Sequence, residues 1–448
     1  MPETLDDLTH ALLDAARKAG AGAADTIAMR GQSVIVDMRG GTLEQAERAE
    51  GTDIGLRVLV GRRQAVVSAS DTRPETIAAL AERAVAMARE APEDPYAGLA
   101  DASQLSDRRD AAGLELCDPA PAPAPETLMR MAQEAEAAAL GVDGISQVQS
   151  ASAAWSRREV HIAASNGFSG GYARGDTGLS CVAIAGTGSG MERDHDGDSR
   201  VFAADLRGAQ EIGHTAGARA AERIGARRPP TGAWPVLFDE RVAATLIGHL
   251  LAAANGAAVA RGSSWLRDRL GAPVLPDGLD LREDPHRPRV SGSRLFDAEG
   301  LPTAPRAIVG GGVLRGYALD LASARKLGMA PTANAARGVS GTPSPAMWNV
   351  ALTQGDRSRA DLLREMGTGL LVTSLIGSTV NPNTGDYSRG AAGFWVEGGE
   401  IAWPVNECTI AGSLPDMLRR ITPANDARTH LSRVVPSLLV EGLTLAGA

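Results

Sequence analysis

Apolar residues recur at helical spacing in two segments near the N-terminus and follow strand-like patterns between them. The spacing predicts a helix over Leu5–Ala19 and a second helix that begins at Pro74 and ends before Pro92. Three shorter segments alternate or run apolar as strands do, at residues 26–29, 33–39 and 56–60. We therefore predict an N-terminal α+β domain over residues 1–115.

A proline-rich segment separates this domain from the next part of the chain. We interpret residues 116–125 as a Pro/Ala connector, because the PAPAPAP run at residues 119–125 favours extended polyproline geometry. The pattern then predicts a helix, a strand-rich stretch with glycine-rich turns and a closing helix, at residues 126–140, 146–190 and about 208–224. Together they form a middle helix-and-strand region, residues 126–228.

Residues 229–448 differ in character and predict a β-rich C-terminal domain. A helix rich in small residues is predicted over about residues 240–258, and glycine-punctuated strands follow it. The sequences GFWVEGG and GEIAWPV meet at the glycine pair 398–399 and predict a hairpin. Ser413 with Asp416 predicts a capping box for a last short helix.

Composition and charge bear on partners and location. A net charge of -9 and only 3% aromatic residues disfavour nucleic acid, which is bound through positive charge and stacking. No run of about 18 apolar residues predicts a membrane-spanning helix, and the N-terminal segment lacks the features of a secretory signal. Three widely spaced cysteines, Cys117, Cys181 and Cys408, fit a reducing compartment better than a disulfide framework. We expect a cytoplasmic protein that binds neither nucleic acid nor membrane.

The sequence has few metal-binding residues at the spacing that a metal site needs. A catalytic zinc needs about three protein ligands, commonly two His on one helix face. The seven histidines are scattered, none is followed by Glu, and even the nearest two, His195 and His214, lie far apart. The acidic sequence DHDGD at residues 194–198 has its Gly misplaced for a calcium loop, so we interpret it as a solvated turn between a strand and the following helix.

A second candidate for chemistry is the sequence GFSGG at residues 167–171, which has the letter pattern of a nucleophile elbow. Such an elbow needs a strand before the Ser and a helix after it, whereas the stretch that follows alternates like another strand. We interpret the glycines as a hairpin turn and keep a serine hydrolase using Ser169 as the weaker alternative. The two lysines, Lys18 and Lys326, do not lie in a Gly-rich phosphate loop.

Long motifs along most of the chain resemble one protein family. The segment PVLFDERVAATLIGHLLAAANGAAVARGSSWL, residues 235–266, resembles the TldE/PmbA family. Further segments are similar to this family in its own order: DAEGLPT, GVLRGYALD, PTANAARG, NPNTGDYSRGAAGF and VNECTIAGSLPDML. The resemblance implies an α+β fold, with an N-terminal helix-and-strand domain and a C-terminal domain of curved, largely antiparallel sheet.

The resemblance also implies a pair of related subunits, of which TldD carries one zinc on a His-Glu-x-x-x-His helix and a downstream Cys. This chain resembles the other subunit, TldE. The motif helix laid on this sequence puts Gly248 and His249 near the His-Glu pair and Ala253 near the second His. The downstream Cys would fall around residues 375–377, where no Cys occurs. We therefore expect no catalytic residue and no metal in this chain, and zinc in the partner subunit.

The function implied by the resemblance is that of a non-catalytic subunit of a TldD/TldE-type metallopeptidase, which processes or degrades unfolded peptides such as peptide-antibiotic precursors or antitoxins. The expected partners are a TldD-like zinc subunit and unfolded peptide, with self-association when the chain is alone. Asn334, Asp386 and Glu407 lie in the matching motifs and are the expected peptide or interface contacts. A homodimeric peptide-binding or scaffolding protein without protease activity has the same sequence signature and stays the alternative. Gly-lined strand edges such as residues 309–314 offer backbone to a peptide, although we favour plain sheet for each of them.

Overall fold

The computed structural model of the protein describes residues 4–447 and shows an α+β fold. Helix α1 (Leu5–Ala19) begins at a capping box formed by Thr4 and Asp7 and ends at Gly20, whose φ of 95° is left-handed. Helix α2 (Pro74–Glu90) begins with the predicted proline in its first turn. Both N-terminal helices are therefore confirmed.

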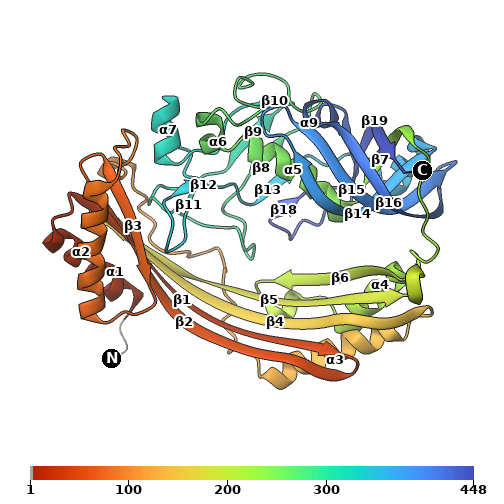
Figure 1. Ribbon diagram of the computed structural model, residues 1–448, viewed down its shortest axis with the longest axis horizontal. Coiled ribbons are helices and arrows are strands. Elements are labelled where there is room, and N and C mark those ends of the chain that lie inside the picture. Colours follow the sequence, from red (N-terminus) through yellow and green to blue (C-terminus); the bar gives the residue numbers. More distant parts are fainter. Residues whose placement is uncertain (1–3, 448) are drawn as a thin grey trace.

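Six antiparallel strands form one curved sheet in the order β3-β2-β1-β4-β5-β6. They are β1 (Ala23–Arg39), β2 (Thr42–Val60), β3 (Arg63–Ala69), β4 (Ile145–Ala164), β5 (Ser169–Ala185) and β6 (Glu192–Arg200). Strand β1 pairs with β4 from Asp25 to Met38, so strands from the N-terminal and middle regions share this sheet. Figure 1 shows the sheet as an arc beneath the C-terminal domain, with α1 and α2 at one end and α3 (Pro125–Leu140) and α4 (Ala209–Ala221) at the other.

Each pair of helices gives its end of the arc a separate apolar core. Helices α3 and α4 approach so closely that a Cβ added at Gly213 would lie 1.9 Å from the Ala135 carbonyl oxygen, and only glycine fits there. A further apolar cluster, which includes Ile162, Phe168 and Phe296, joins the arc to the C-terminal domain. The middle of the arc therefore serves as a platform for that domain.

The C-terminal domain contains a closed barrel and a smaller sheet. The barrel has the strand order β16-β15-β14-β7-β19-β17, and an additional pairing of β16 with β19 closes it. Its strands are β7 (Gly232–Phe238), β14 (Gly369–Val380), β15 (Asp386–Glu397), β16 (Glu400–Ser413), β17 (Ile421–Pro423) and β19 (Leu438–Ala446). The smaller sheet holds β8 (Leu281–Glu283), β9 (Arg306–Gly310), β10 (Val313–Leu314), β13 (Val350–Leu352) and β18 (Arg433–Val434), and β11 (Ala335–Ala336) pairs with β12 (Ser344–Pro345). The predicted fold class and the hairpin at residues 398–399 are confirmed.

The helices of this domain correct two details of the prediction. The helix expected over residues 240–258 is interrupted, because α5 (Glu240–Ala253) ends at Ala254 and the Asn255 side chain caps a new helix, α6 (Gly256–Ala260). The capping box predicted at Ser413 is wrong, since the Ser413 side chain makes no capping hydrogen bond to α9 (Leu414–Leu418). The remaining helices are α7 (Leu321–Leu327) and α8 (Arg359–Met366).

The acidic sequence at residues 194–198 belongs to strand β6, so its interpretation as a solvated turn is wrong. Asp194 is buried and accepts hydrogen bonds from Arg223 and Arg241, each at 3.1 Å. Asp196, also buried, pairs with two further arginines. The turn interpretation failed because these partners come from distant segments. Arg241 lies in the first turn of α5, so this ion pair also ties the arc to the C-terminal domain.

Two further observations limit the possible interactions. Within residues 4–447, no helix is long and apolar enough to cross a membrane. The strand edge at residues 309–314 is already occupied, because the backbone N–H of Leu314 donates to Ala272 and that of Val274 donates to Gly312. This edge therefore serves as plain sheet and has no free backbone for a peptide at these groups.

Candidate functional site

Helix α5 places the three positions on which the resemblance lays the zinc motif in different surroundings. Gly248 lines a cavity of about 530 Å³, and a Cβ added there would lie 3.2 Å from Arg433 Nη1. His249 packs its ring edge-on against the Tyr387 ring, with centroids 5.8 Å apart. Ala253 is part of the buried apolar core. Of the three positions, only His249 carries a side chain that can bind a metal.

The surroundings of His249 disfavour a cation. Its Nε2 is buried and has no hydrogen-bond partner among the described residues. Burial, and after it the charge of Arg389, lowers the pKa of His249. The Arg389 Nε donates to the Gly377 carbonyl oxygen at 2.6 Å. The guanidinium therefore links the His249 surroundings to residues 375–377, the place where the resemblance expects a Cys.

Cys408 does not replace that missing ligand. Its thiol donates to the Ala391 carbonyl at 3.2 Å, and burial raises the pKa of Cys408 to about 11, so the sulfur stays protonated near neutral pH. In the part of the chain that the structure describes, no group of three or more His, Cys, Asp or Glu is arranged to hold a metal ion. The donor set around α5 therefore does not fit a catalytic zinc.

Ser169 begins β5 just after a hairpin turn, so the hairpin interpretation is confirmed. Its Oγ lies 3.5 Å from His161 Nε2 and 3.3 Å from the Asp6 carboxylate. The same ring nitrogen lies 3.2 Å from Asp6, whereas Nδ1 lies 2.8 Å from the Thr9 hydroxyl. A catalytic triad has its carboxylate on the ring nitrogen that faces away from the Ser. This cluster therefore joins α1 to the sheet without the geometry of an activated nucleophile.

The three residues expected to contact peptide or partner are not brought together in one setting. Asn334 is buried, and its amide donates to both carboxylate oxygens of Glu283, at 2.9 and 3.1 Å. Asp386 is exposed at the start of β15. Glu407 is exposed on β16, has a φ of 48° and accepts a hydrogen bond from Arg228 at 2.8 Å. Asn334 thus stabilises the interior, while Asp386 and Glu407 lie at the surface.

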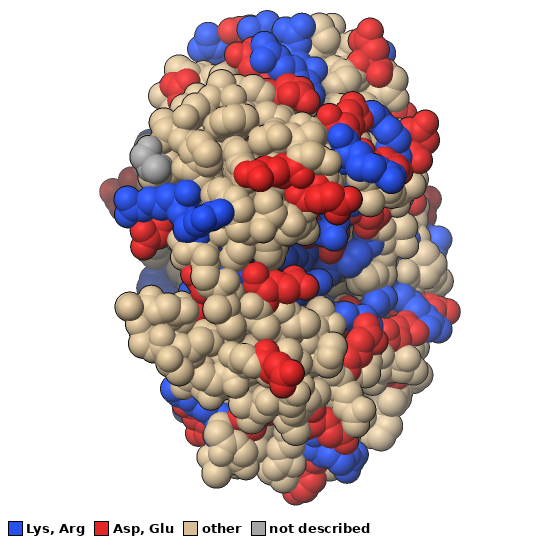
Figure 2. Space-filling view, turned by 90° about the vertical axis from the view of Figure 1, so that its right-hand side faces the viewer, with Lys and Arg blue, Asp and Glu red and all other residues tan. Residues whose placement is uncertain are grey.

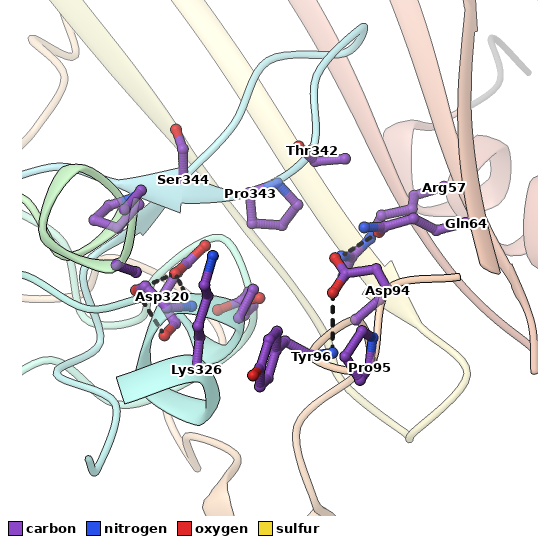
Figure 3. Close-up of a pocket in the computed structure, with 18 of the residues that line it drawn as sticks. Arg57, Gln64, Asp94, Pro95, Tyr96, Asp320, Lys326, Thr342, Pro343 and Ser344 are labelled. Carbon is purple, nitrogen blue, oxygen red and sulfur yellow. Dashed lines mark hydrogen bonds between the residues drawn. The ribbon is translucent and has the colours of Figure 1, made fainter. Parts of the chain in front are cut away.

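A cavity of about 570 Å³ lies where β2 and β3 face the C-terminal domain, and we call it the mixed-charge cavity. Figure 3 shows Arg57 and Gln64 of the sheet on one side of it, with Asp320 and Lys326 of the C-terminal domain on the other. Its lining carries charges of both signs, namely Arg57, Arg261, Lys326, Glu93, Asp94, Glu299 and Asp320. Cations and carboxylates can therefore balance one another inside this cavity.

Buried charges beneath the mixed-charge cavity join the arc to the C-terminal domain. Asp25 of β1 accepts a hydrogen bond from Arg57 Nε at 2.7 Å and also pairs with Arg337 from the C-terminal domain. Burial, followed by the charge of Asp297, raises the pKa of Glu299 to about 8. Glu299 is consequently largely neutral near pH 7, which reduces the repulsion among the clustered carboxylates.

Figure 1 shows the concave side of the arc facing the C-terminal domain. A different kind of cavity, of about 300 Å³, is lined by residues of both. Its lining includes four arginines and no Asp or Glu among the described residues, and we call it the arginine cavity: Arg158, Arg174, Arg294 and Arg337. It shares lining residues with the cavity beside Gly248, which we call the helix cavity: Ser291, Gly292 and Trp348. Figure 2 shows a hollow between the two halves of the molecule with basic side chains inside it.

The arginine cavity was not predicted from the sequence, because its four arginines come from β4, β5 and two C-terminal loops. A partial signal exists in the motif SGSRLFDAEG, where Arg294 and Asp297 interrupt an apolar run. Charged residues in such a run are buried only when they are paired. That signal indicates buried charge, but it does not indicate which distant residues converge.

A curved antiparallel sheet joined to a closed barrel, with charged cavities between them, defines the class as a bipartite α+β protein. Three domain models of PmbA/TldA metallopeptidases match residues 24–88 (domain 1), 118–227 (central domain) and 231–447 (C-terminal domain). The chain therefore belongs to the PmbA/TldD metallopeptidase family.

Individual relatives agree with this assignment. The chain is 38% identical to the metalloprotease PmbA of Escherichia coli O157:H7, over 92% of this chain and 90% of that protein. It is 35% identical to a PmbA homologue of Haemophilus influenzae, over 97% and 94% of the two chains. A candidate modulator of DNA gyrase from Bacteroides thetaiotaomicron superimposes with a TM-score of 0.90, at 27% identity and 99% and 100% coverage. TldE of Thermococcus kodakarensis shares the fold, with a TM-score of 0.85, 20% identity and 98% and 99% coverage.

Proposed function

We propose that this chain is the zinc-less subunit of a two-subunit metallopeptidase that cuts unfolded peptides in the cytoplasm. The observation that carries the proposal is the state of helix α5. Of the three motif positions only His249 retains a metal-binding side chain, and its neighbours are the Tyr387 ring and the Arg389 charge. A cation beside a lone, half-buried His disfavours a second cation at the same place. Hydrolysis would then depend on a sister chain that carries the zinc.

What this chain contributes, in this proposal, is binding surface. The helix cavity, of about 530 Å³, lies beside α5 and adjoins the arginine cavity, of about 300 Å³. A peptide fits such a groove in an extended conformation, which it adopts only when its backbone is not already hydrogen-bonded within a folded structure. Disordered peptides should therefore be cut and folded domains spared. Asp386 and Glu407, exposed on barrel strands, are available for contact with the sister chain.

A mixing experiment tests the proposal. An unfolded reporter peptide is incubated with this chain, with a zinc-bearing sister chain and with both, each with and without a strong chelator. Cleavage is expected only for the mixture, and it should vanish with chelator. Cleavage by this chain alone, insensitive to chelator and abolished by Ser169→Ala, would contradict the proposal in favour of a serine hydrolase.

Oligomeric state separates the proposal from a homodimeric scaffold without protease activity. Light scattering should report a dimer for the chain alone, because an unpartnered subunit tends to self-associate through the surface that its partner would cover. Addition of the sister chain should convert the homodimer into a heteromeric complex. A homodimer that persists beside an equimolar sister chain would favour the scaffold.

A further inference from the structure

The arginine cavity and the helix cavity form one positively charged groove in an acidic protein. They meet at Ser291, Gly292 and Trp348, and the helix cavity adds Arg433 to the four arginines of the arginine cavity. Neither has an Asp or Glu among its described lining residues. Because the whole chain has a net charge of -9, this concentration of positive charge is local to the groove, where Asp25 and Glu283 compensate it only in part.

Two arginines of the groove are buried with unused hydrogen-bond donors. Arg294 is 6% exposed and the Arg337 side chain 0%. Nε of Arg294, and Nε and Nη2 of Arg337, have no hydrogen-bond partner among the described residues. Burial lowers the pKa of each guanidinium to about 10, which leaves both charged near neutral pH. Buried donors on charged groups are nearly always paired, so these three nitrogen atoms indicate a missing acceptor.

The nearby carboxylates are already engaged elsewhere. Asp25 is shared between Arg57 and Arg337, so it does not neutralise both. Glu283 accepts hydrogen bonds from Asn334 and Arg306 and lies 3.9 Å from Arg294, beyond hydrogen-bond distance. Water can accept the remaining hydrogen bonds but brings no negative charge. An anion supplied from outside satisfies both requirements.

The other walls of the groove indicate what carries that anion. The mouth is marked by the exposed Arg158 and by Trp348, which is 38% exposed. Met29, Tyr172 and Phe296 add apolar and aromatic surface to the arginine cavity. This combination of buried cations and apolar walls fits a peptide better than a polyphosphate chain, which has no apolar surface to place against those walls.

We propose that the groove binds an acidic peptide segment, with one carboxylate seated on Arg294 and Arg337 and the chain running past Trp348 toward Gly248. The inference rests on the proposed function, because it names the class of peptide that the two-subunit enzyme would take. It is also testable without cleavage. A peptide in this position would lie along the cavity-facing side of α5, beside the degenerate motif. The carboxylate belongs either to an Asp or Glu side chain or to the peptide C-terminus.

The experiment measures binding of fluorescein-labelled, unstructured octapeptides to this chain alone, by fluorescence polarisation. The peptides contain either two Glu or two Gln among Gly, Ser and Ala, each with a free or an amidated C-terminus. The peptide without any of these carboxylates should bind at least about ten-fold more weakly than the best acidic peptide, because charge-assisted pairs to buried guanidinium groups are lost. Comparison of the Glu with the Gln peptides tests the side-chain carboxylate, and comparison of the free with the amidated C-termini tests the terminal carboxylate. Equal affinity of all four peptides would overturn the proposal.

Variants locate the site. The guanidinium groups of Arg158 and Arg433 make no hydrogen bond or ion pair with other described residues, so the double variant Arg158→Gln/Arg433→Gln should fold normally. It should weaken the binding of acidic peptide by about three- to ten-fold, because electrostatic attraction at the mouth of the groove is lost. Arg48→Gln, an exposed strand arginine outside the groove, is the matched control and should change nothing. Arg294→Lys keeps the charge but loses the planar fork, and should weaken binding by roughly ten-fold, with the urea midpoint checking its fold.

The outcomes separate this inference from the proposed function. Unchanged affinity in both the double variant and a folded Arg294→Lys would overturn the groove as the site. A single-stranded oligonucleotide, or inorganic phosphate, that displaces the peptide at concentrations below those of the Glu peptide would overturn the choice of ligand. Cleavage by the two-subunit mixture without any acidic preference in binding would defeat this inference alone. Acidic peptide binding without cleavage by the mixture would instead defeat the proposed function.

Discussion

Two cavities flank the contact between the arc and the C-terminal domain, and they handle charge in opposite ways. The mixed-charge cavity has cations and carboxylates in its own lining, and one of its acids, Glu299, has its pKa raised to about 8. The arginine cavity has cations only. A cavity whose own lining supplies counter-ions needs no ligand to be stable, whereas one whose buried arginines share too few carboxylates gains by taking up an anion. The difference assigns a structural role to the first cavity and a binding role to the second.

Asp25 is the internal counter-ion that joins the two cavities, and its removal should have the largest effect on stability. Asp25→Asn leaves Arg57 and Arg337 buried without their shared carboxylate. Breaking a buried ion pair from one side costs about 3–5 kcal/mol. Urea unfolding measures the loss, and the exposed Asp14→Asn, which removes only a surface pair with Arg17, should stay within about 0.5 kcal/mol. Equal stability of the two variants would refute the role given to Asp25.

Acidic peptide should stabilise the folded chain by filling the arginine cavity. At a free concentration one hundred times its Kd, a ligand that binds only the folded state adds about 2.7 kcal/mol. The gain should be read as a higher urea midpoint with the Glu octapeptide and not with its amidated Gln counterpart. A similar rise in the urea midpoint with both peptides would mean that a bound peptide does not stabilise the chain by balancing the charge of this cavity.

The pH dependence of stability should distinguish the mixed-charge cavity from the arginine cavity. The pKa of Glu299 is about 8 in the folded state against 4.5 for a free Glu, so the folded chain holds this proton more tightly than the unfolded chain does. The Glu299 contribution to stability is therefore fully present below about pH 4.5 and is lost as the pH rises toward 8.

Glu299→Gln tests this directly. The variant should flatten the fall in the free energy of unfolding across that pH window and should be more stable than the parent at pH 8, by roughly 1–3 kcal/mol. The exposed Glu44→Gln on the β2 edge of the arc provides the control. A slope that is unchanged in Glu299→Gln would show that this carboxyl is ionised throughout.

Ser169→Ala should have the smallest effect. The hydroxyl contacts His161 and Asp6 at 3.5 and 3.3 Å, which are long hydrogen bonds at the edge of the sheet. We expect a loss of at most about 0.5 kcal/mol in unfolding free energy and no change in chelator-sensitive cleavage by the mixture. A large loss of cleavage with unchanged stability would restore the hydrolase alternative.

The fold was accessible from the sequence to the extent that local patterns determine it. Apolar periodicity predicts helices α1 and α2, and a proline marks the start of α2. The glycine pair predicts the β15–β16 hairpin. Strand β1 was predicted as two segments, but it is one continuous strand, because it also pairs across residues 30–32, which are only half-buried. The length of β2 was underestimated, because its first ten residues are exposed and carry no alternating apolar pattern. Periodicity reports burial, and these segments pair without being buried.

The site was accessible only in part. The absence of metal-binding side chains at Gly248 and Ala253 follows from residue identity alone and needs no coordinates. The arginine cavity could not be predicted, since Arg158, Arg294 and Arg337 are separated along the chain and meet only when the arc curves against the C-terminal domain. For the same reason the buried Asp residues of β6 were mistaken for a solvated turn: the arginines that pair with them lie on other elements.

The central claim, that this chain carries no catalytic zinc and a sister chain does, is tested most directly by metal analysis after gel filtration. The purified chain should contain much less than one equivalent of zinc, and its complex with the sister chain about one equivalent per pair, because the surroundings of His249 lack the further ligands that a catalytic centre needs. Stoichiometric zinc in this chain alone, retained through mild chelation, would contradict the account.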